Sequence, residues 1–225
     1  RHDRLVWTDD DFEHPPDWLD QLSADYDRQG PVSEVPFFRG RDALSVLLEP
    51  TNVFGGTLTT WAADIPWGGS VIFERGDLEV DAFRADLTRT ISDDGTLDEH
   101  LDVTSIRRVH EVSAGGTIHE SLERFVRFIK IVRFHGPGIT VFNALALLAL
   151  TALLVLYPVL TTVAVTLSYG IIYAAFGIRR WTFLLAVPAT ILNLPLFAYA
   201  LARRTFVWGG RRYRWRSMFD VEVVE

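Results

Sequence analysis

The stretch Val6-Trp7-Thr8-Asp9-Asp10-Asp11 runs from apolar residues into three consecutive carboxylates, and Phe12-Glu13-His14-Pro15-Pro16-Asp17-Trp18-Leu19 follows it directly. The first residues are typical of a β-strand, and the Pro-Pro pair predicts a turn before a helix that begins near Asp17. Carboxylates crowded at a strand end repel one another, and a divalent cation offsets that repulsion. Hard oxygen ligands suit Mg²⁺ or Mn²⁺, which commonly also hold a diphosphate. The alternative is a solvated turn in an acidic chain.

Charge divides the chain into two parts. Residues 1–138 carry 26 Asp and Glu against 14 Lys and Arg, whereas residues 139–225 carry 3 against 8. The first part therefore reads as a soluble acidic domain, which argues against nucleic acid as a partner. An acidic surface with Lys130 as the one lysine indicates a salt-adapted protein, such as one from a halophilic archaeon. Because the chain has no cysteine, disulfides, thiolate catalysis and Cys-ligated zinc are excluded.

The acidic part alternates strand-like and helix-like segments, which predicts an α/β domain with ligands at strand ends. Strands are expected over residues 32–38 and 70–73, and helices over residues 18–27, 41–48 and 78–87. The chain opens with no methionine and no signal peptide, so we interpret it as the C-terminal portion of a longer protein. Five histidines show no spacing typical of a zinc site and are expected to be surface or structural residues: His14, His100, His110, His119 and His135.

Three apolar runs follow, over residues 139–157, 159–178 and 181–202, and each is about long enough to cross a bilayer. The tight link at Pro158 predicts an antiparallel hairpin. Arginine pairs at 179–180 and 203–204 both favour the cytoplasmic side. Three complete spans do not satisfy both pairs. The expected membrane region is therefore two spans plus a third segment that either spans or, because it contains Pro188 and Pro195, is bent or re-entrant.

Residues 120–138 lie before these runs and interleave aromatic with basic side chains. This spacing predicts an amphipathic helix in the membrane interface, broken by Gly136-Pro137-Gly138. Residues 205–225 form a tail rich in arginine and tryptophan, which suits the headgroup region. The predicted organisation is thus an acidic domain over 1–119, an interfacial helix over 120–138, a membrane region over 139–204 and the tail.

Three further segments contain residues suited to chemistry. Asp93-Asp94 is an acidic pair before a glycine, which is either a simple turn or a functional site. Trp67-Gly68-Gly69 offers backbone access and an indole that could stack on a sugar, or it is a tight turn with the indole packed in the core. Arg124-Phe125-Val126-Arg127-Phe128 either grips a diphosphate through its guanidinium groups or binds anionic lipid.

In this order the segments resemble the motifs of inverting glycosyltransferases of family 2, most closely the membrane-bound ceramide glucosyltransferase type. The resemblance implies a partial GT-A domain that takes a nucleotide-diphosphate sugar donor and a lipid or membrane-proximal hydroxyl acceptor. By that resemblance Asp9 and Asp11 approach an Mg²⁺ or Mn²⁺ ion and the diphosphate. Asp94 matches the general base, and Asp93 orients it or binds the acceptor.

The resemblance also assigns the donor diphosphate or acceptor to six residues: Arg124, Arg127, Phe128, Trp67, Gly68 and Gly69. Two positions depart from the family pattern, since Phe128 stands in place of a tryptophan and Gly209 in place of an arginine in the closing motif. The loss of an indole N–H at position 128 puts the acceptor contact in doubt.

The expected protein is therefore a multi-pass membrane glycosyltransferase with a cytoplasmic catalytic domain. Two alternatives stay open. The chain is otherwise a non-catalytic membrane protein with an acidic cation-binding domain, or a truncated, inactive glycosyltransferase fragment.

Overall fold

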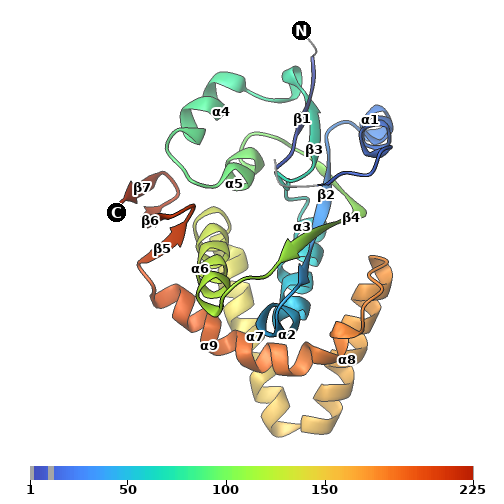
Figure 1. Ribbon diagram of the computed structural model, residues 1–225, viewed down its shortest axis with the longest axis vertical. Helices are drawn as coiled ribbons and strands as arrows, with labels where there is room; N and C mark the ends of the chain where they lie inside the picture. The colour runs from blue at the N-terminus through green and yellow to red at the C-terminus, as the bar shows by residue number, and fades with distance from the viewer. Residues whose placement is uncertain (1–2, 10–12, 225) are drawn as a thin grey trace. The chain divides into compact units, whose positions relative to one another are not determined.

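The computed structural model of the protein describes residues 3–9 and 13–224. It is mixed α/β, with 58% helix and 20% strand, as the sequence predicts, and Figure 1 traces its elements. The chain folds as two compact units. The first comprises Arg1–Phe37 and Phe54–Val112, and the second comprises Phe38–Val53 and Ser113–Glu225. The boundary expected at residue 119 thus lies several residues after the structural one, and residues 38–53 cluster with the second unit.

The first unit is built on a four-stranded sheet with the order β1-β3-β2-β4. Its strands are β1 Arg4–Trp7, β2 Val32–Gly40, β3 Val71–Glu74 and β4 Thr104–Ala114. β3 pairs antiparallel with β1 on one side and with β2 on the other. The strands predicted over 32–38 and 70–73 are confirmed, and β3 lies between two strands that precede it in the chain. The residues just before β3 are therefore placed beside those just after β1.

Helices cover both faces of this sheet because side chains alternate along β3. Val71 and Phe73 pack in one apolar cluster with residues of α4 and α5, whereas Ile72 packs on the opposite side with Trp18 of α1. The helical elements of this part of the chain are α1 Trp18–Gln29, η1 Val53–Leu58, α3 Thr59–Ala62, η2 Arg75–Asp77, α4 Val80–Leu87 and α5 Asp93–Asp98. The helices predicted over residues 18–27 and 78–87 are confirmed.

The second unit is mainly helical. Its elements are α2 Ala43–Asn52, α6 Ile118–His135, α7 Pro137–Leu156, α8 Pro158–Ala175, η3 Trp181–Leu185, α9 Ala186–Ala202 and the strands β5 Thr205–Trp208, β6 Arg211–Ser217 and β7 Asp220–Val223. α6 confirms the helix predicted before the apolar runs, and it begins with a capping box in which Thr117 and Glu120 exchange hydrogen bonds. The three strands form an antiparallel sheet of order β5-β6-β7.

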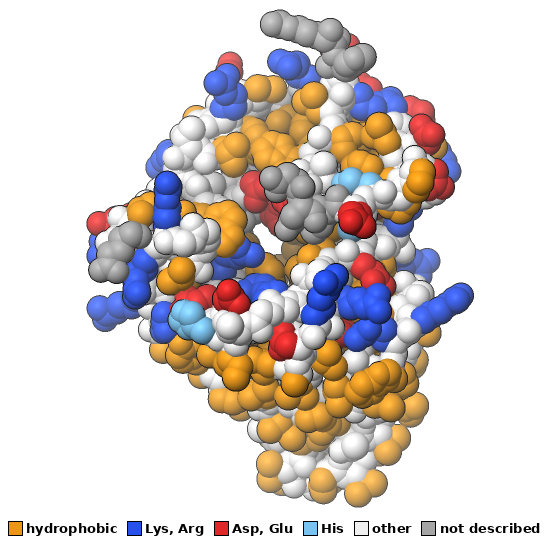
Figure 2. Space-filling view, viewed as in Figure 1, with side chains coloured by type: hydrophobic (Ala, Val, Ile, Leu, Met, Phe, Trp, Pro, Cys, Tyr) orange, Lys and Arg blue, Asp and Glu red, His pale blue; other side chains and the backbone are white. Residues whose placement is uncertain are grey.

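Three helices of the described chain are long and apolar enough to cross a membrane, namely Pro137–Leu156, Pro158–Ala175 and Trp181–Ala202. Large apolar side chains on them face outward, and Val155, Val159 and Leu160 are at least 70% exposed. In Figure 2 hydrophobic side chains cover the region of these helices, and its lowest part shows no charged side chain. So much exposed apolar surface is consistent with membrane association, and the three apolar helices that the sequence predicts are present.

Candidate functional site

A single hydroxyl holds the segment after β1 against the segment before β3. Thr8 follows the last residue of β1, and its Oγ1 donates to the carbonyl oxygen of Gly69 at 3.0 Å. The same oxygen lies 2.9 Å from His14 Nε2. A hydroxyl has one proton, so when Thr8 donates to Gly69 it accepts from a protonated Nε2 of His14. Asp9, which is exposed beside Thr8, is thereby placed close to the glycine turn.

The acidic pair reaches the same turn from another element. Asp93 and Asp94 form the first turn of α5, whose N-cap Ser92 accepts from the Gly95 N–H. The Gly68 N–H donates to Asp94 Oδ1 at 2.7 Å. A Cβ at position 68 would lie 2.3 Å from Asp94 Oδ1 and 3.2 Å from Asp93 Oδ2. The pair is thus the start of a helix packed on a glycine, and the simple-turn alternative is not what the structure shows.

The two acidic segments therefore contact consecutive residues, Gly68 and Gly69. The Cα atoms of these two glycines are about 3.8 Å apart. Asp94 is bonded to the first glycine, and the neighbour of Asp9 is bonded to the second. Stretches of chain some 85 residues apart thus meet at one turn in the first unit. Asp11, the other predicted metal ligand, lies outside the described residues.

The Trp67 indole is packed inside the first unit. It is only 7% exposed, and its ring centroid lies 5.7 Å from that of His110. The backbone N–H of Trp67 donates to the Ser33 hydroxyl at 2.8 Å, and the backbone carbonyl oxygen of Trp67 accepts from the Ser70 N–H at 2.9 Å, which closes the turn. Of the two alternatives for this segment, the structure shows the tight turn with a buried indole. Trp67 therefore has a structural role, which is to hold the glycine turn in place.

Glu34 on β2 anchors this turn and was not identified from the sequence. Its side chain is 1% exposed and accepts from Trp18 Nε1 at 3.0 Å, Ser70 Oγ at 2.8 Å and Arg108 Nη1 at 3.2 Å, while His110 Nδ1 lies 3.5 Å away. Burial by itself raises the pKa of Glu34, but the hydrogen bonds from His110, Ser70, Trp18 and Arg108 together bring it below its ordinary value. The charged carboxylate thus holds Ser70, the residue after the glycine pair, against β2.

His14 stacks on this network from the side of the Asp-rich segment. Its ring lies 3.6 Å from that of Trp18, nearly parallel to it, and 5.0 Å from that of His110. Burial and the neighbouring His110 lower the pKa of His14, so its ring is neutral near pH 7. His14 and His110 are structural residues, which agrees with the expectation that the histidines are either surface or structural.

Acidification is expected to loosen this arrangement. His14 has a folded-state pKa below its ordinary 6.5, so its contribution to stability is complete above pH 6.5 and is lost as the pH falls from there toward the folded-state pKa. The lowered pKa of Glu34 also makes the folded protein less stable as the pH falls, in its case below the ordinary value of 4.5. Denaturant midpoints from tryptophan fluorescence at pH 7.5, 6 and 5 would measure this. The fall between pH 7.5 and 5 should be smaller in His14→Gln, and an equal fall in both proteins contradicts the assignment.

Gly68→Ala is expected to displace the Asp94 carboxylate, since the new Cβ would lie 2.3 Å from Oδ1. A shift of about 1 Å in a catalytic group costs on the order of 10²-fold in rate. The measurement is turnover in the transfer assay described below, at unchanged protein level. Gly76→Ala is the matched control, because a Cβ there meets nothing within 4 Å. Equal turnover of the two variants would show that Asp94 does not act from its observed position.

The remaining candidate residues lie on α6 in the second unit. The Arg124 guanidinium donates to the Gly115 carbonyl oxygen at 2.8 Å. The Arg127 guanidinium stands 4.8 Å from the centroid of the Trp208 ring and 5.3 Å from that of Phe128. Such cation–π contacts fix the orientation of the arginine. They also connect the basic motif to the C-terminal tail through Trp208 on β5.

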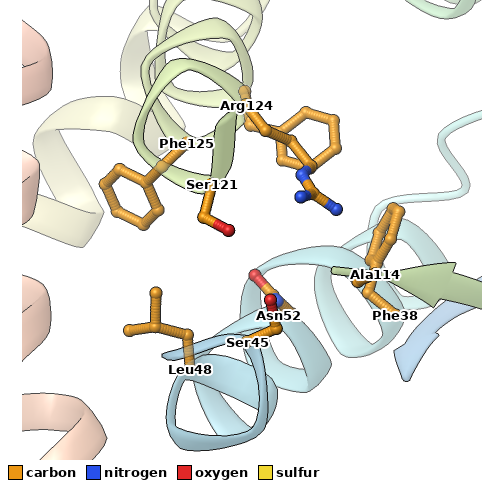
Figure 3. Close-up of a pocket in the computed structure, with 9 residues that line it drawn as sticks. Phe38, Ser45, Leu48, Asn52, Ala114, Ser121, Arg124 and Phe125 are labelled. Atoms are coloured by element: carbon orange, nitrogen blue, oxygen red, sulfur yellow. The ribbon is translucent and has the colours of Figure 1, made fainter. Parts of the chain in front are cut away.

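Arg124 and Phe128 line a cavity of about 30 Å³ between α2 and α6. In Figure 3 Arg124 and Ser121 on α6 point toward Asn52 and Ser45 on α2. The Ser121 hydroxyl is buried and has no hydrogen-bond partner. A cavity of this size matches roughly one water molecule and is too small for a sugar ring. The complete lining is Phe38, Ser45, Leu48, Asn52, Ala114, Ser121, Arg124, Phe125 and Phe128.

Across residues 3–9 and 13–224, no three His, Asp or Glu side chains are grouped in a way that could hold a metal ion by themselves. Mg²⁺ is commonly bound by one or two carboxylates and completed by substrate phosphates and water. The exposed Asp9 carboxylate beside a glycine turn fits that kind of donor set. A cation there would need further oxygen ligands from a bound phosphate group or water.

Comparisons with models of protein families, with curated proteins and with solved structures found no match to this chain. What the protein does is therefore inferred from its own residues and their geometry.

Proposed function

We propose that the protein is a membrane-bound inverting glycosyltransferase that moves a sugar from a nucleotide-diphosphate donor to a lipid or membrane-proximal hydroxyl. In this proposal the first unit is part of a GT-A domain, and it lies on the cytoplasmic side. The observation that supports the proposal most directly is the meeting of Asp94 and the Asp9 segment at Gly68-Gly69. A sugar transfer of this kind needs a base for the acceptor and a carboxylate for the diphosphate side of the donor.

In the proposed reaction Asp94 acts as general base. A sugar or lipid hydroxyl is a poor nucleophile, so its proton passes to the Asp94 carboxylate while its oxygen forms a bond to the anomeric carbon. The bond from that carbon to the nucleoside diphosphate breaks, and the diphosphate leaves with the electron pair. One displacement inverts the anomeric centre, and no covalent enzyme intermediate forms. The Gly68 N–H keeps the base in position through its bond to Oδ1.

Asp9 and Asp11 are the proposed ligands of an Mg²⁺ or Mn²⁺ ion, which when bound would neutralise the departing diphosphate. The hydrogen bonds of Thr8 with Gly69 and His14 keep the Asp9 segment beside Asp94, the proposed base. Arg124 and Arg127 are proposed to contact the diphosphate or the acceptor. Phe128 is proposed to give the acceptor an aromatic contact.

The membrane helices explain why such a catalytic unit would sit at a bilayer. The described chain contains three helices apolar enough to span it, and α6 alternates aromatic with basic side chains just before the first of them. A lipid acceptor partitions into the same bilayer, so anchoring raises its local concentration.

The test is an assay of sugar transfer in membranes that carry the complete gene product. UDP-glucose and other nucleotide-diphosphate sugars with a radiolabelled sugar are supplied with Mn²⁺ or Mg²⁺, and label is counted in the lipid extract. The expected result is transfer that EDTA abolishes and that fresh Mn²⁺ or Mg²⁺ restores. Membranes without the protein are the control. Absence of turnover with every donor would favour a non-catalytic, cation-binding membrane protein.

A further inference from the structure

α7 and α8 form a hairpin whose two arms are joined by Tyr157 alone. At 1.5 Å per residue their 20 and 18 residues are about 30 Å and 27 Å long. A bilayer core is about 30 Å thick. Residues 139–178 contain no charged side chain. The hairpin can therefore cross the core and return without placing a charge in it.

The third apolar segment begins at a contact with α2. The Arg180 Nε donates to Glu49 Oε1 at 2.6 Å, and the Thr182 hydroxyl donates to the same oxygen. Glu49 is on α2 and is completely buried. A buried carboxylate requires such partners, so this end of the segment is held firmly at α2.

The same segment ends at a contact with α6. The Arg203 Nη2 donates to Glu123 Oε1 at 3.0 Å, and Lys130 Nζ donates to the Arg203 carbonyl oxygen at 2.8 Å. The second oxygen of Glu123 accepts from the Val207 N–H at 2.8 Å, which fixes the start of β5 as well. The buried side chain of Glu123 on α6 thus accepts hydrogen bonds from both Arg203 and Val207.

The two anchoring carboxylates lie on α2 and α6, two helices of the second unit that contact each other. Glu49 follows Leu48 and Glu123 precedes Arg124, and those neighbours line the same cavity of about 30 Å³. A straight helix of 22 residues is about 33 Å long, so an upright third span would place its ends on opposite faces of the bilayer. The two ends are instead held by α2 and α6, and α9 runs across the α7–α8 hairpin in Figure 1 rather than alongside its arms.

α9 has two apolar faces with different partners. One face is buried against α2, α6, α7 and α8, and it presents Ala186, Ala189, Phe197 and Ala200. The opposite face is exposed, with side chains at helical spacing: Pro188, Ile191, Pro195 and Ala198, preceded by Leu184 of η3. Exposed Tyr199 lies on this face as well, and its hydroxyl accepts from Arg203 Nη1 at 2.6 Å. The face carries no charged side chain, which fits acyl chains better than water. Figure 1 shows α9 running across the α7–α8 hairpin.

We propose that only α7 and α8 cross the bilayer, and that α9 lies within the leaflet on the α2–α6 side with its exposed face on acyl chains. Exposed Arg179 and Arg204 flank the two ends of this segment. Both would meet anionic headgroups of one leaflet, which agrees with the positive-inside tendency. The sheet β5–β7 consequently lies on the same side of the membrane as α6.

Cysteine labelling tests the sidedness directly, because the chain contains no cysteine. Three single substitutions are made at exposed positions: His119→Cys before the membrane region, Tyr157→Cys at the hairpin tip and Ser217→Cys in β6. A membrane-impermeant maleimide is applied to intact cells and to inverted vesicles, and labelling in detergent confirms that each thiol reacts. Positions 119 and 217 should react only in inverted vesicles, and position 157 only in intact cells. Labelling of 119 and 217 from opposite sides, or of 119 and 157 from the same side, overturns the proposal.

The depth of α9 provides a second, independent measurement. Spin labels at Leu184→Cys, Ile191→Cys and Ala198→Cys report depth through their collisions with oxygen and a polar relaxant. Positions 184 and 198 are separated by about 21 Å along a helix. In the proposed orientation the three labels lie at similar depths, whereas a spanning helix would spread them progressively over most of those 21 Å. The progressive result overturns the proposal.

Discussion

Asp94→Asn is expected to lower the turnover number for sugar transfer by about 10²- to 10⁴-fold, the range that a general base typically contributes. The asparagine side chain keeps an oxygen that can accept from the Gly68 N–H, so the contact at 2.7 Å survives the change. What is lost is the ability to take a proton from the acceptor. Initial rates with saturating donor and acceptor, compared with the donor Michaelis constant, would separate loss of chemistry from loss of binding.

Asp93→Asn is the matched control for this variant. Both residues lie in the first turn of α5, and both are half-buried. Asp93 is proposed to orient the base or the acceptor, so its replacement should cost clearly less than that of Asp94. If the two variants lose turnover equally, or if Asp94→Asn keeps wild-type rates, the assignment of the base is wrong.

Glu49→Ala is expected to reduce the free energy of unfolding of the second unit by about 3–5 kcal/mol, which is typical of removing one partner of a buried ion pair. The alanine would leave Arg180 and the Gly40 N–H without the carboxylate that they now share. The fully buried position gives water little access to replace it. Unfolding by urea or SDS in detergent micelles, followed by circular dichroism, is the measurement.

Glu222→Ala removes the same side chain from an exposed pair and serves as the comparison. Glu222 accepts from Arg216 at 2.8 Å and from Arg214 at 3.4 Å at the surface of the small sheet. Exposed pairs of this kind contribute about 0–1 kcal/mol. A loss at Glu49 no larger than that at Glu222 would mean that the buried contact does not hold the third apolar segment.

The longer helices of the protein and its first three strands follow from sequence patterns, whereas α5 and the strands β4–β7 were not predicted. The apolar runs after residue 138 predicted α7, α8 and the third segment, because each run is long and continuously apolar. The interleaved aromatic and basic residues likewise predicted α6. The position of α9 across the hairpin was only partly foreseeable. The arginine pairs indicated an even number of crossings, but the contacts with Glu49 and Glu123 depend on which helices pack together.

In the candidate site, too, residues marked by a local sequence pattern could be predicted, whereas residues that depend on how the strands pair could not. Asp94, Gly68 and Asp9 stand out in the sequence because each lies in a short acidic or glycine-containing stretch. Glu34 gives no such signal, since a single glutamate in a strand-like run usually faces solvent. Its role arises because β3 inserts between β1 and β2 and places Ser70 beside it. The packing of Trp67 in the interior has the same origin.

The contact between Lys130 and the Arg203 carbonyl oxygen has a practical consequence for chemical probing. Lys130 is the one lysine in the chain, it is 3% exposed, and burial lowers the pKa of its amine. The native fold therefore withholds its side-chain ammonium from acylating reagents. Reaction of that amine with an N-hydroxysuccinimide ester would record openings between α6 and the end of α9 as a permanent covalent change. Mass spectrometry would locate it at position 130, because arginine side chains do not react and the α-amino group gives a separate product.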